Sequence, residues 1–224
     1  MKSLSLRFTK KEMLLWISSM LIVGCANAAA PEFDLLILTA ALVGVSSLIL
    51  AAKGNVMAQI LMIVFSILYG VISYRFRYWG EMITYLGMTL PMAVWSAVVW
   101  FRNPSEDAGV VKIGTMNKCK WIILSVLAIA VTGLFYCILA YFDTPNIMIS
   151  TLSITTSFYA ASLTILRSSY FAVFYAMNDL VLIVLWILAA IEDPVYFPVI
   201  INFSIFFVND IYGFVSWRRR ERKN

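Results

Sequence analysis

The segment Ser169–Ala190, SYFAVFYAMNDLVLIVLWILAA, decides the fold class of this chain. Asp179 is its one charged residue, and nearly all the others are apolar. A helix of roughly 20 such residues is long enough to cross the hydrocarbon core of a bilayer, which is about 30 Å thick. The segment is therefore predicted to be a membrane-spanning helix.

Further segments of similar length and apolar character occur along the whole chain. The sequence is 62% hydrophobic and 13% charged, whereas soluble domains have about 25% charged residues. The breaks between the segments carry Pro, Gly and charged residues. We predict eight spans: Met13–Ala30, Asp34–Ala52, Asn55–Tyr74, Glu81–Phe101, Trp121–Phe142, Asn146–Leu166, Ser169–Ala190 and Val195–Trp217.

The basic residues predict how these spans are oriented. With eight spans, both termini lie on one side, together with the loops after spans 2, 4 and 6. All but two of the 17 Lys and Arg residues fall on that side, the exceptions being Arg75 and Arg77. Since cytoplasmic loops carry the excess of Lys and Arg, both termini are predicted to be cytoplasmic in a multi-pass protein of the cell membrane.

The first span has two interpretations. A basic start, the apolar run Met13–Gly24 and the small residues Ala26–Ala30 also resemble a secretory signal peptide. An uncleaved first helix keeps eight spans. Cleavage would leave seven spans with the same orientation.

Composition also excludes several function classes. The formal net charge of +5 is spread over segment ends, as topology signals are, and does not form a patch for nucleic acid. The three cysteines, Cys25, Cys119 and Cys137, have no metal-binding or disulfide spacing. The chain has no histidine, which removes His-based metal sites and Ser-His-Asp triads. We therefore expect neither an enzyme nor a bound metal or cofactor.

Spans 2–4 and spans 6–8 are related by a weak internal repeat. An offset of 117 residues aligns Tyr69 with Trp186 and Trp100 with Trp217. Spans 2 and 6 run in the same direction, so the two three-helix units are parallel and span 5 links them. Parallel repeats with a site between them are a transporter design. The predicted parts are an N-terminal helix (1–33), a first repeat (34–104), a loop and linker helix (105–145), a second repeat (146–217) and a basic tail (218–224).

Polar residues inside the spans are candidate substrate contacts, because polar groups at membrane depth are rare and often functional. Phe171, Phe174 and Asn178 share one helix face. A polar stripe runs along the last span. The same residue types also join membrane helices to one another, so each has a structural alternative. The stripe consists of Asn202, Asn209, Tyr212 and Ser216, and Gln59 and Trp186 are further candidates.

Asp179 and Asp210 are the acidic residues deepest in the spans. Three roles are open for them: hydrogen-bonded structural groups, counter-charges for a positive substrate, or sites for a coupling proton. Aromatic rings and amides around them would suit a flat heterocycle with hydrogen-bonding edges.

The segment Asn209–Trp217, NDIYGFVSW, together with Asn178 and Tyr69…Tyr78-Trp79-Gly80-Glu81, resembles the PnuC family of nicotinamide riboside transporters. The resemblance covers roughly Asp34 to Arg219. It implies a three-one-three helix arrangement like that of the SWEET sugar carriers, facilitated diffusion of nicotinamide riboside for NAD biosynthesis, and trapping by a cytoplasmic kinase. It also implies a homotrimer, with Asn209 and Tyr212 as the family's Asn-x-x-Tyr substrate motif.

This chain departs from the family pattern at one place. The family commonly has Trp-x-x-Trp where this chain has Phe171 and Phe174, which keep a stacking surface but lack the indole N–H. Thiamine and riboflavin, which related carriers handle, therefore remain alternative substrates. A membrane sensor without transport is a third alternative. Asp179 is expected to assist in holding the cationic pyridinium ring of nicotinamide riboside.

Overall fold

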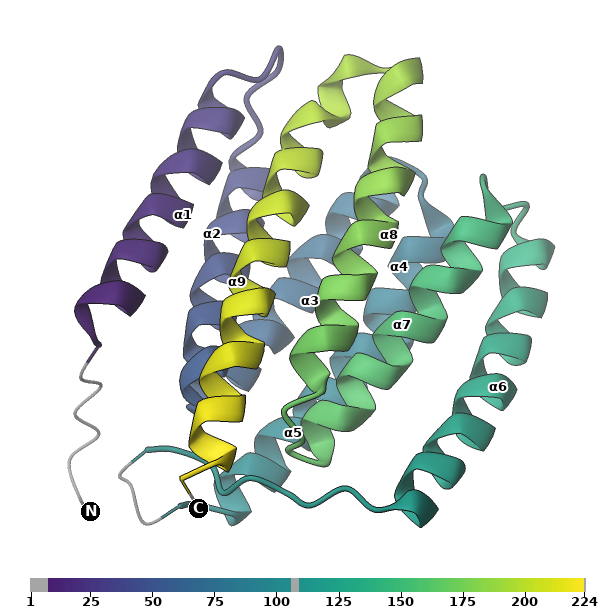
Figure 1. Cartoon of the computed structure of the whole chain (residues 1–224). Coiled ribbons are helices and arrows are strands. Elements are labelled where there is room, and N and C mark those ends of the chain that lie inside the picture. Colours follow the sequence, from purple (N-terminus) through teal and green to yellow (C-terminus); the bar gives the residue numbers. More distant parts are fainter. Residues whose placement is uncertain (1–7, 106–108, 224) are drawn as a thin grey trace.

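The computed structural model describes residues 8–105 and 109–223, and these residues form a bundle of long helices (Figure 1). No β-sheet occurs among them, apart from one isolated bridge between Pro104 and Val111. The helices are α1 (Lys10–Ala28), α2 (Leu35–Lys53), α3 (Met57–Arg75), α4 (Trp79–Thr84), α5 (Leu90–Arg102), α6 (Lys118–Tyr141), α7 (Ile147–Ile165), α8 (Phe171–Glu192) and α9 (Phe197–Glu221), with the short elements η1 (Tyr85–Thr89) and η2 (Pro194–Tyr196).

The fold is that of a multi-pass membrane protein. In the described ranges, seven helical segments are long and apolar enough to cross a membrane, and each matches one of the predicted spans 2–8 within a few residues. The first helix, α1, does not belong to that group. The count of eight spans therefore stays a prediction. The predicted distribution of basic residues over the two sides also includes Lys2 and Arg7, which lie outside the described residues.

The helices run side by side, with α1 at one edge of the bundle and α6 at the other (Figure 1). Helix α9 packs against α8, α2 and α1, and α7 packs between α8 and α6. Helix α1 begins and α9 ends at the same end of the bundle (Figure 1). Large side chains on α2, α3, α8 and α9, including Phe65, Tyr69, Trp186 and Phe203, form the main core.

The helical segment formed by α4, η1 and α5 contains a π-helical turn. Helix α4 continues through η1 into α5, and Pro91 lies in the first turn of α5. Proline has no backbone N–H and its ring displaces the carbonyl of the preceding turn, so a local widening of the helix accommodates it. Such turns often mark functional positions. Here the turn includes Tyr85 and Thr89, which both line a cavity between the helices.

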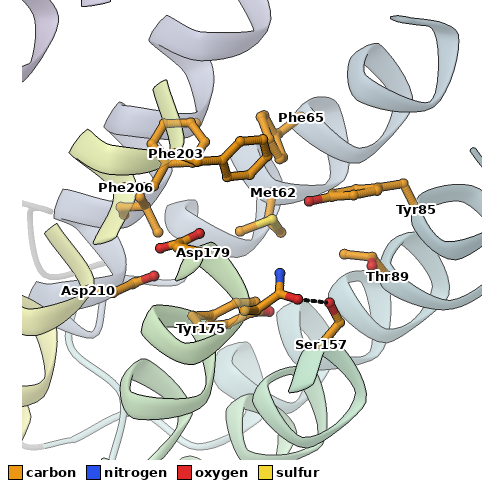
Figure 2. Close-up of a pocket in the computed structure, with 13 residues that line it drawn as sticks. Met62, Phe65, Tyr85, Thr89, Ser157, Tyr175, Asp179, Phe203, Phe206 and Asp210 are labelled. Carbon is orange, nitrogen blue, oxygen red and sulfur yellow. Dashed lines mark hydrogen bonds between the residues drawn. The ribbon is translucent and has the colours of Figure 1, made fainter. Parts of the chain in front are cut away.

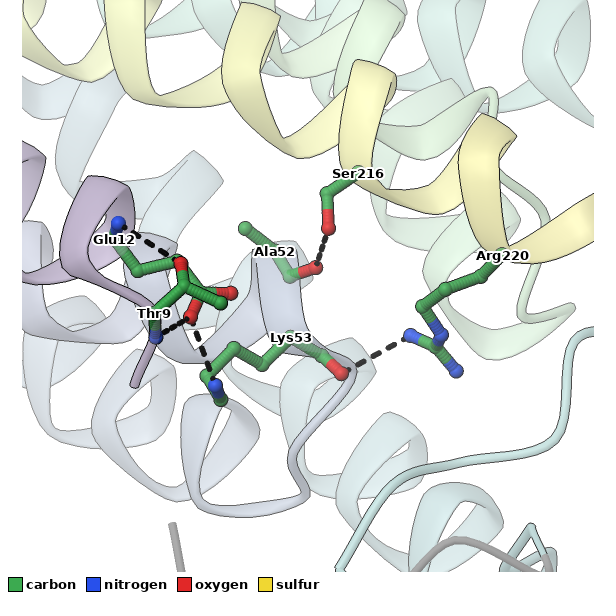
Figure 3. A network of polar contacts seen from close by, with 6 residues as sticks. All are labelled: Thr9, Glu12, Ala52, Lys53, Ser216 and Arg220. Carbon is green, nitrogen blue, oxygen red and sulfur yellow. Dashed lines mark hydrogen bonds and ion pairs between the residues drawn. The ribbon is translucent and has the colours of Figure 1, made fainter. Parts of the chain in front are cut away.

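A network of polar contacts holds α1, α2 and α9 together at the end where the chain begins and ends (Figure 3). The Lys53 ammonium lies 3.0 Å from a Glu12 carboxylate oxygen, and an Arg220 guanidinium N–H donates to the Lys53 carbonyl at 3.0 Å. Gly54 ends α2 with φ of 74°, and a Cβ at this position would lie 2.3 Å from the Arg220 side chain. Glycine is therefore favoured by the left-handed backbone, and its missing Cβ leaves room for the Arg220 guanidinium.

The predicted polar stripe of the last span faces α1 and α2. Asn27 donates to the Asn202 side-chain oxygen at 3.2 Å, and Asn209 donates to the Ser19 hydroxyl at 3.0 Å. Ser216 donates to the Ala52 carbonyl at 2.8 Å. In the described structure these groups therefore serve helix–helix association, which is the structural alternative that such residues have in a membrane.

Candidate functional site

The main cavity lies in the middle of the bundle, between α2, α3, η1, α7, α8 and α9. Its volume of about 40 Å³ is room for a few water molecules, since one water needs roughly 10–15 Å³ on this scale. A larger ligand requires the lining side chains to move. The lining residues are Gly44, Leu48, Met62, Phe65, Tyr85, Thr89, Ser157, Tyr175, Asn178, Asp179, Phe203, Phe206 and Asp210.

Two carboxyl groups face each other on one wall of this cavity. Asp179 comes from α8 and Asp210 from α9, and their side chains point toward one another (Figure 2). Asp179 is 5% exposed and Asp210 is 4% exposed. One oxygen of Asp179, Oδ2, is buried without a hydrogen-bond partner. No Lys or Arg lines the cavity in the part of the chain that the structure describes.

Asn178 brings an amide to the same cavity. Its side-chain oxygen lies within hydrogen-bond distance of the hydroxyls of Ser153, Thr156 and Ser157, at 3.2, 2.9 and 3.0 Å. In this arrangement the hydroxyls surround the amide oxygen and leave the NH₂ group for other partners. The NH₂ group makes no hydrogen bond within residues 8–105 and 109–223, so it is available to a ligand.

Aromatic rings separate this cavity from a smaller one. Phe65, Phe203 and Phe206 line both cavities, and the ring of Phe206 packs edge-on to the other two at 5.7 and 5.5 Å. A Cβ on Gly44 would lie 2.5 Å from the Phe206 ring, so glycine allows this ring to approach α2. The three rings form a partition between the two cavities, and rotation of their side chains would connect them.

Among the predicted substrate contacts, the structure brings Asn178 and Asp179 to the cavity and leaves the others outside it. Asn209 is 1% exposed against α1, and Tyr212 is half-buried nearer the end of α9. Gln59 is buried but does not line the cavity. A ligand contact by these three residues stays a prediction.

The predicted aromatic contacts also lie outside this cavity. Phe171 packs edge-on against Trp217 at 4.9 Å. Phe174 stacks on Tyr159, with ring centres 4.7 Å apart. Trp186 is fully buried, and its indole N–H donates to the Tyr69 hydroxyl at 2.9 Å. The face of α8 that carries Phe171 and Phe174 thus lies among other aromatic rings, and its role in substrate binding stays a prediction.

Several cavity residues were not among the predicted contacts. Phe203, Phe206 and Asp210 lie at i, i+3 and i+7 on α9, so they share one face of that helix. The position of Asp210 on this face was the available signal, because an acidic residue at membrane depth seldom faces lipid. Tyr175 and Ser157 gave no comparable signal, since tyrosine and serine are common in membrane helices.

A polytopic helical bundle with a mainly apolar cavity that carries a few polar groups between its helices is the organisation of a small-molecule carrier. Comparison with known proteins defines the class further. The sequence profile described as "Nicotinamide mononucleotide transporter" matches residues 34–219. The chain belongs to this family.

Two relatives support that assignment. The nicotinamide riboside transporter PnuC of Neisseria mucosa is 19% identical over 190 residues, which are 83% of this chain and 72% of the relative. The crystal structure of the vitamin B3 transporter PnuC superimposes with a TM-score of 0.84 and 19% identity, covering 97% of this chain and 94% of the other. The resemblance to the PnuC family is thereby confirmed, and the structural match shows that the fold is shared.

Proposed function

We propose that this protein carries nicotinamide riboside across the cell membrane. The observation that carries the proposal is the chemistry of the central cavity, which combines aromatic rings, a free amide NH₂ group and two carboxyl groups. Nicotinamide riboside has a cationic pyridinium ring, a carboxamide and ribose hydroxyls. Aromatic faces attract a cation by about 0.5–2 kcal/mol, and the amide suits the polar edges of the ligand.

The same cavity distinguishes the riboside from the mononucleotide for which the family profile is named. A phosphate group carries up to two negative charges and is normally bound by Arg, Lys or backbone N–H groups. The cavity residues include two Asp and neither Lys nor Arg. The repulsion between phosphate and carboxylates therefore favours the riboside.

The finer features follow from the family resemblance and from the helix order. We expect facilitated diffusion, with phosphorylation by a cytoplasmic kinase trapping the riboside, and we expect a homotrimer. The two three-helix units, 34–104 and 146–217, would rock against each other around the cavity. Contacts between the equivalent positions Tyr69 and Trp186, and between Trp100 and Trp217, support this two-unit arrangement. Both termini would lie in the cytoplasm.

Thiamine is a second candidate substrate. It also contains a cationic aromatic ring, so the acidic cavity favours it over riboflavin, which is uncharged. Phe171 and Phe174, which replace the family's tryptophans, are the sequence feature that keeps this candidate open.

Uptake of radiolabelled nicotinamide riboside into liposomes that contain the purified protein tests the proposal. The expected result is uptake that exceeds that of protein-free liposomes, stops when internal and external concentrations are equal, and is not inhibited by nicotinamide mononucleotide. Absence of uptake by folded protein would refute the proposal. Inhibition by thiamine at lower concentrations than the riboside would favour the second candidate.

A further inference from the structure

Among the described residues, Asp179 and Glu81 are the buried acidic residues with a carboxyl oxygen that has no hydrogen-bond partner, and of the two Asp179 lines the cavity. Asp34 caps α2 and pairs with Arg75 at 2.7 Å, and Glu12 pairs with Lys53 at 3.0 Å. Asp193 caps the short helix η2. By contrast, Asp179 Oδ2 is buried without any hydrogen-bond partner. Acidic groups in a membrane interior are normally paired, so an unpaired one at a cavity indicates a missing ligand.

The surroundings of Asp179 and Asp210 offer no compensating positive charge. The cavity lining around them includes Met62 of α3, Gly44 and Leu48 of α2, and Phe206 of α9. The titratable neighbours on the cavity wall are the phenols Tyr85 and Tyr175, which are uncharged at neutral pH. Hydroxyls of Thr89 and Ser157 complete the polar lining, so the described lining contains no positively charged group that would attract an anion.

Two carboxyl groups that face each other in an apolar medium do not both ionise, because like charges at close range repel strongly. When the two groups share one proton, the pair carries one net negative charge. A ligand with a single positive charge neutralises it. An uncharged ligand leaves it unbalanced, and an anion adds to it.

We infer that the Asp179–Asp210 pair is a counter-charge site that makes the cavity selective for singly positive aromatic ribosides over uncharged ligands of the same shape. The inference rests on the proposed function, since it names the property by which the proposed substrate is recognised. Asp179 supplies the unpartnered oxygen. Asp210 holds the second carboxyl against it (Figure 2).

Calorimetric binding of two ligands to the full-length protein tests the inference. Nicotinamide riboside carries the charge, and benzamide riboside, in which benzene replaces the pyridinium ring, has nearly the same shape without it. The wild type is expected to bind the charged ligand at least about 30-fold more tightly, since an unbalanced buried charge is worth 2 kcal/mol or more. Asp179→Asn is expected to lose most of this preference, because its affinity for nicotinamide riboside falls. Its affinity for benzamide riboside is expected to change less than about threefold.

Asp210→Asn gives an independent version of the same test, and Asp143→Asn is the matched control. Asp143 is exposed in the α6–α7 loop, and its positive φ of 48° suits Asn equally well. Thermal unfolding of every variant shows whether it is folded, and removal of a buried carboxylate should not lower the midpoint. An equal loss of affinity for both ligands, or an unchanged preference in both cavity variants, would overturn this inference but not the proposed function. Failure of the folded wild type to bind nicotinamide riboside would overturn the proposed function as well.

Discussion

The two predicted three-helix units, residues 34–104 and 146–217, which are called the two halves below, differ in what they contribute to the cavity. The first half supplies Gly44, Leu48, Met62, Phe65, Tyr85 and Thr89. The second half supplies all of the carboxyl and amide groups, namely Asn178, Asp179 and Asp210. The predicted offset of 117 residues aligns Met62 with Asp179, and both residues line the cavity.

Where the two units meet, in contrast, both contribute large aromatic residues. Tyr69 and Trp186, which the predicted offset aligns, hydrogen-bond to each other at 2.9 Å. Trp100 and Trp217, which it also aligns, have ring centres 5.6 Å apart. The comparison teaches that both units supply aromatic packing at their junction, while the carboxyl groups of the cavity come from one unit. Such asymmetry suits a ligand with one charged end.

The largest expected effect comes from breaking the junction at Trp217. This side chain is fully buried, packs on Trp100, and its indole N–H donates to the Ala51 carbonyl at 2.8 Å. Replacing a buried Trp by Ala removes packing and leaves a cavity, at about 3–5 kcal/mol. Trp217→Ala should therefore lower the midpoint of thermal unfolding in detergent by far more than Trp95→Ala, because Trp95 is 64% exposed. Equal midpoints for the two variants would show that the junction does not hold the halves together.

A smaller effect is expected from Asn178→Ala, which removes the polar centre of the second half. The substitution deprives the hydroxyls of Ser153 and Ser157 of their acceptor, whereas the Thr156 hydroxyl keeps the carbonyls of its own helix. Unsatisfied buried donors cost about 1–3 kcal/mol, so the unfolding midpoint should fall. Affinity for nicotinamide riboside should fall about tenfold, which corresponds to one lost hydrogen bond.

Asn103→Ala is the control for that experiment, because the Asn103 amide bonds only to the Val99 carbonyl of its own helix at the end of the bundle. Its riboside affinity should equal that of the wild type. Loss of stability by Asn178→Ala without loss of affinity would place Asn178 among the structural residues of the second half.

The sequence alone predicted the spans but only part of the cavity. Apolar length and charged breaks fix where a helix crosses a membrane, so spans 2–8 were predicted within a few residues. They do not fix which face of a helix meets which neighbour. The stripe of α9 that includes Asn202 and Asn209 hydrogen-bonds to α1, because α1 docks on that face, and a ligand contact by these residues stays a prediction. Asn178 and Asp179 line the central cavity, and their contact with a ligand also stays a prediction.

An effect of intermediate size is expected from removing the hydrogen bond between Trp186 and Tyr69 at the junction. Trp186→Phe keeps a buried ring and removes the donor to the Tyr69 hydroxyl. The loss should be about 1 kcal/mol. A double-mutant cycle with Tyr69→Phe measures the coupling, which averages about 0.6 kcal/mol for polar pairs between membrane helices. A coupling near zero would mean that the equivalent positions only touch and do not stabilise each other.

The smallest expected effect concerns Lys53 of the first half, which joins α1 through Glu12 and α9 through Arg220 (Figure 3). Glu12 precedes the predicted span Met13–Ala30. Burial would raise the pKa of Glu12, but the Thr9 backbone N–H and the Lys53 ammonium outweigh it, so its pKa lies below the ordinary value of 4.5. A carboxyl group with a lowered pKa stabilises the folded state above its unfolded pKa, and this contribution is lost as the pH falls through the folded pKa.

Lowering the pH from 7 to below about 4 should therefore weaken the attachment of α1 by less than about 1 kcal/mol, which is the usual range for such pairs. Hydrogen exchange of α1 amides, measured at both pH values and corrected for intrinsic rates, reports the change. Glu12→Gln should show the weaker attachment already at pH 7 and little further change on acidification. Glu221→Gln is the matched control, because Glu221 pairs with Arg218 of its own helix and does not contact α1. If Glu12→Gln and wild type responded alike to acid, the pH dependence of the attachment would have to arise elsewhere than in the pair between Glu12 and Lys53.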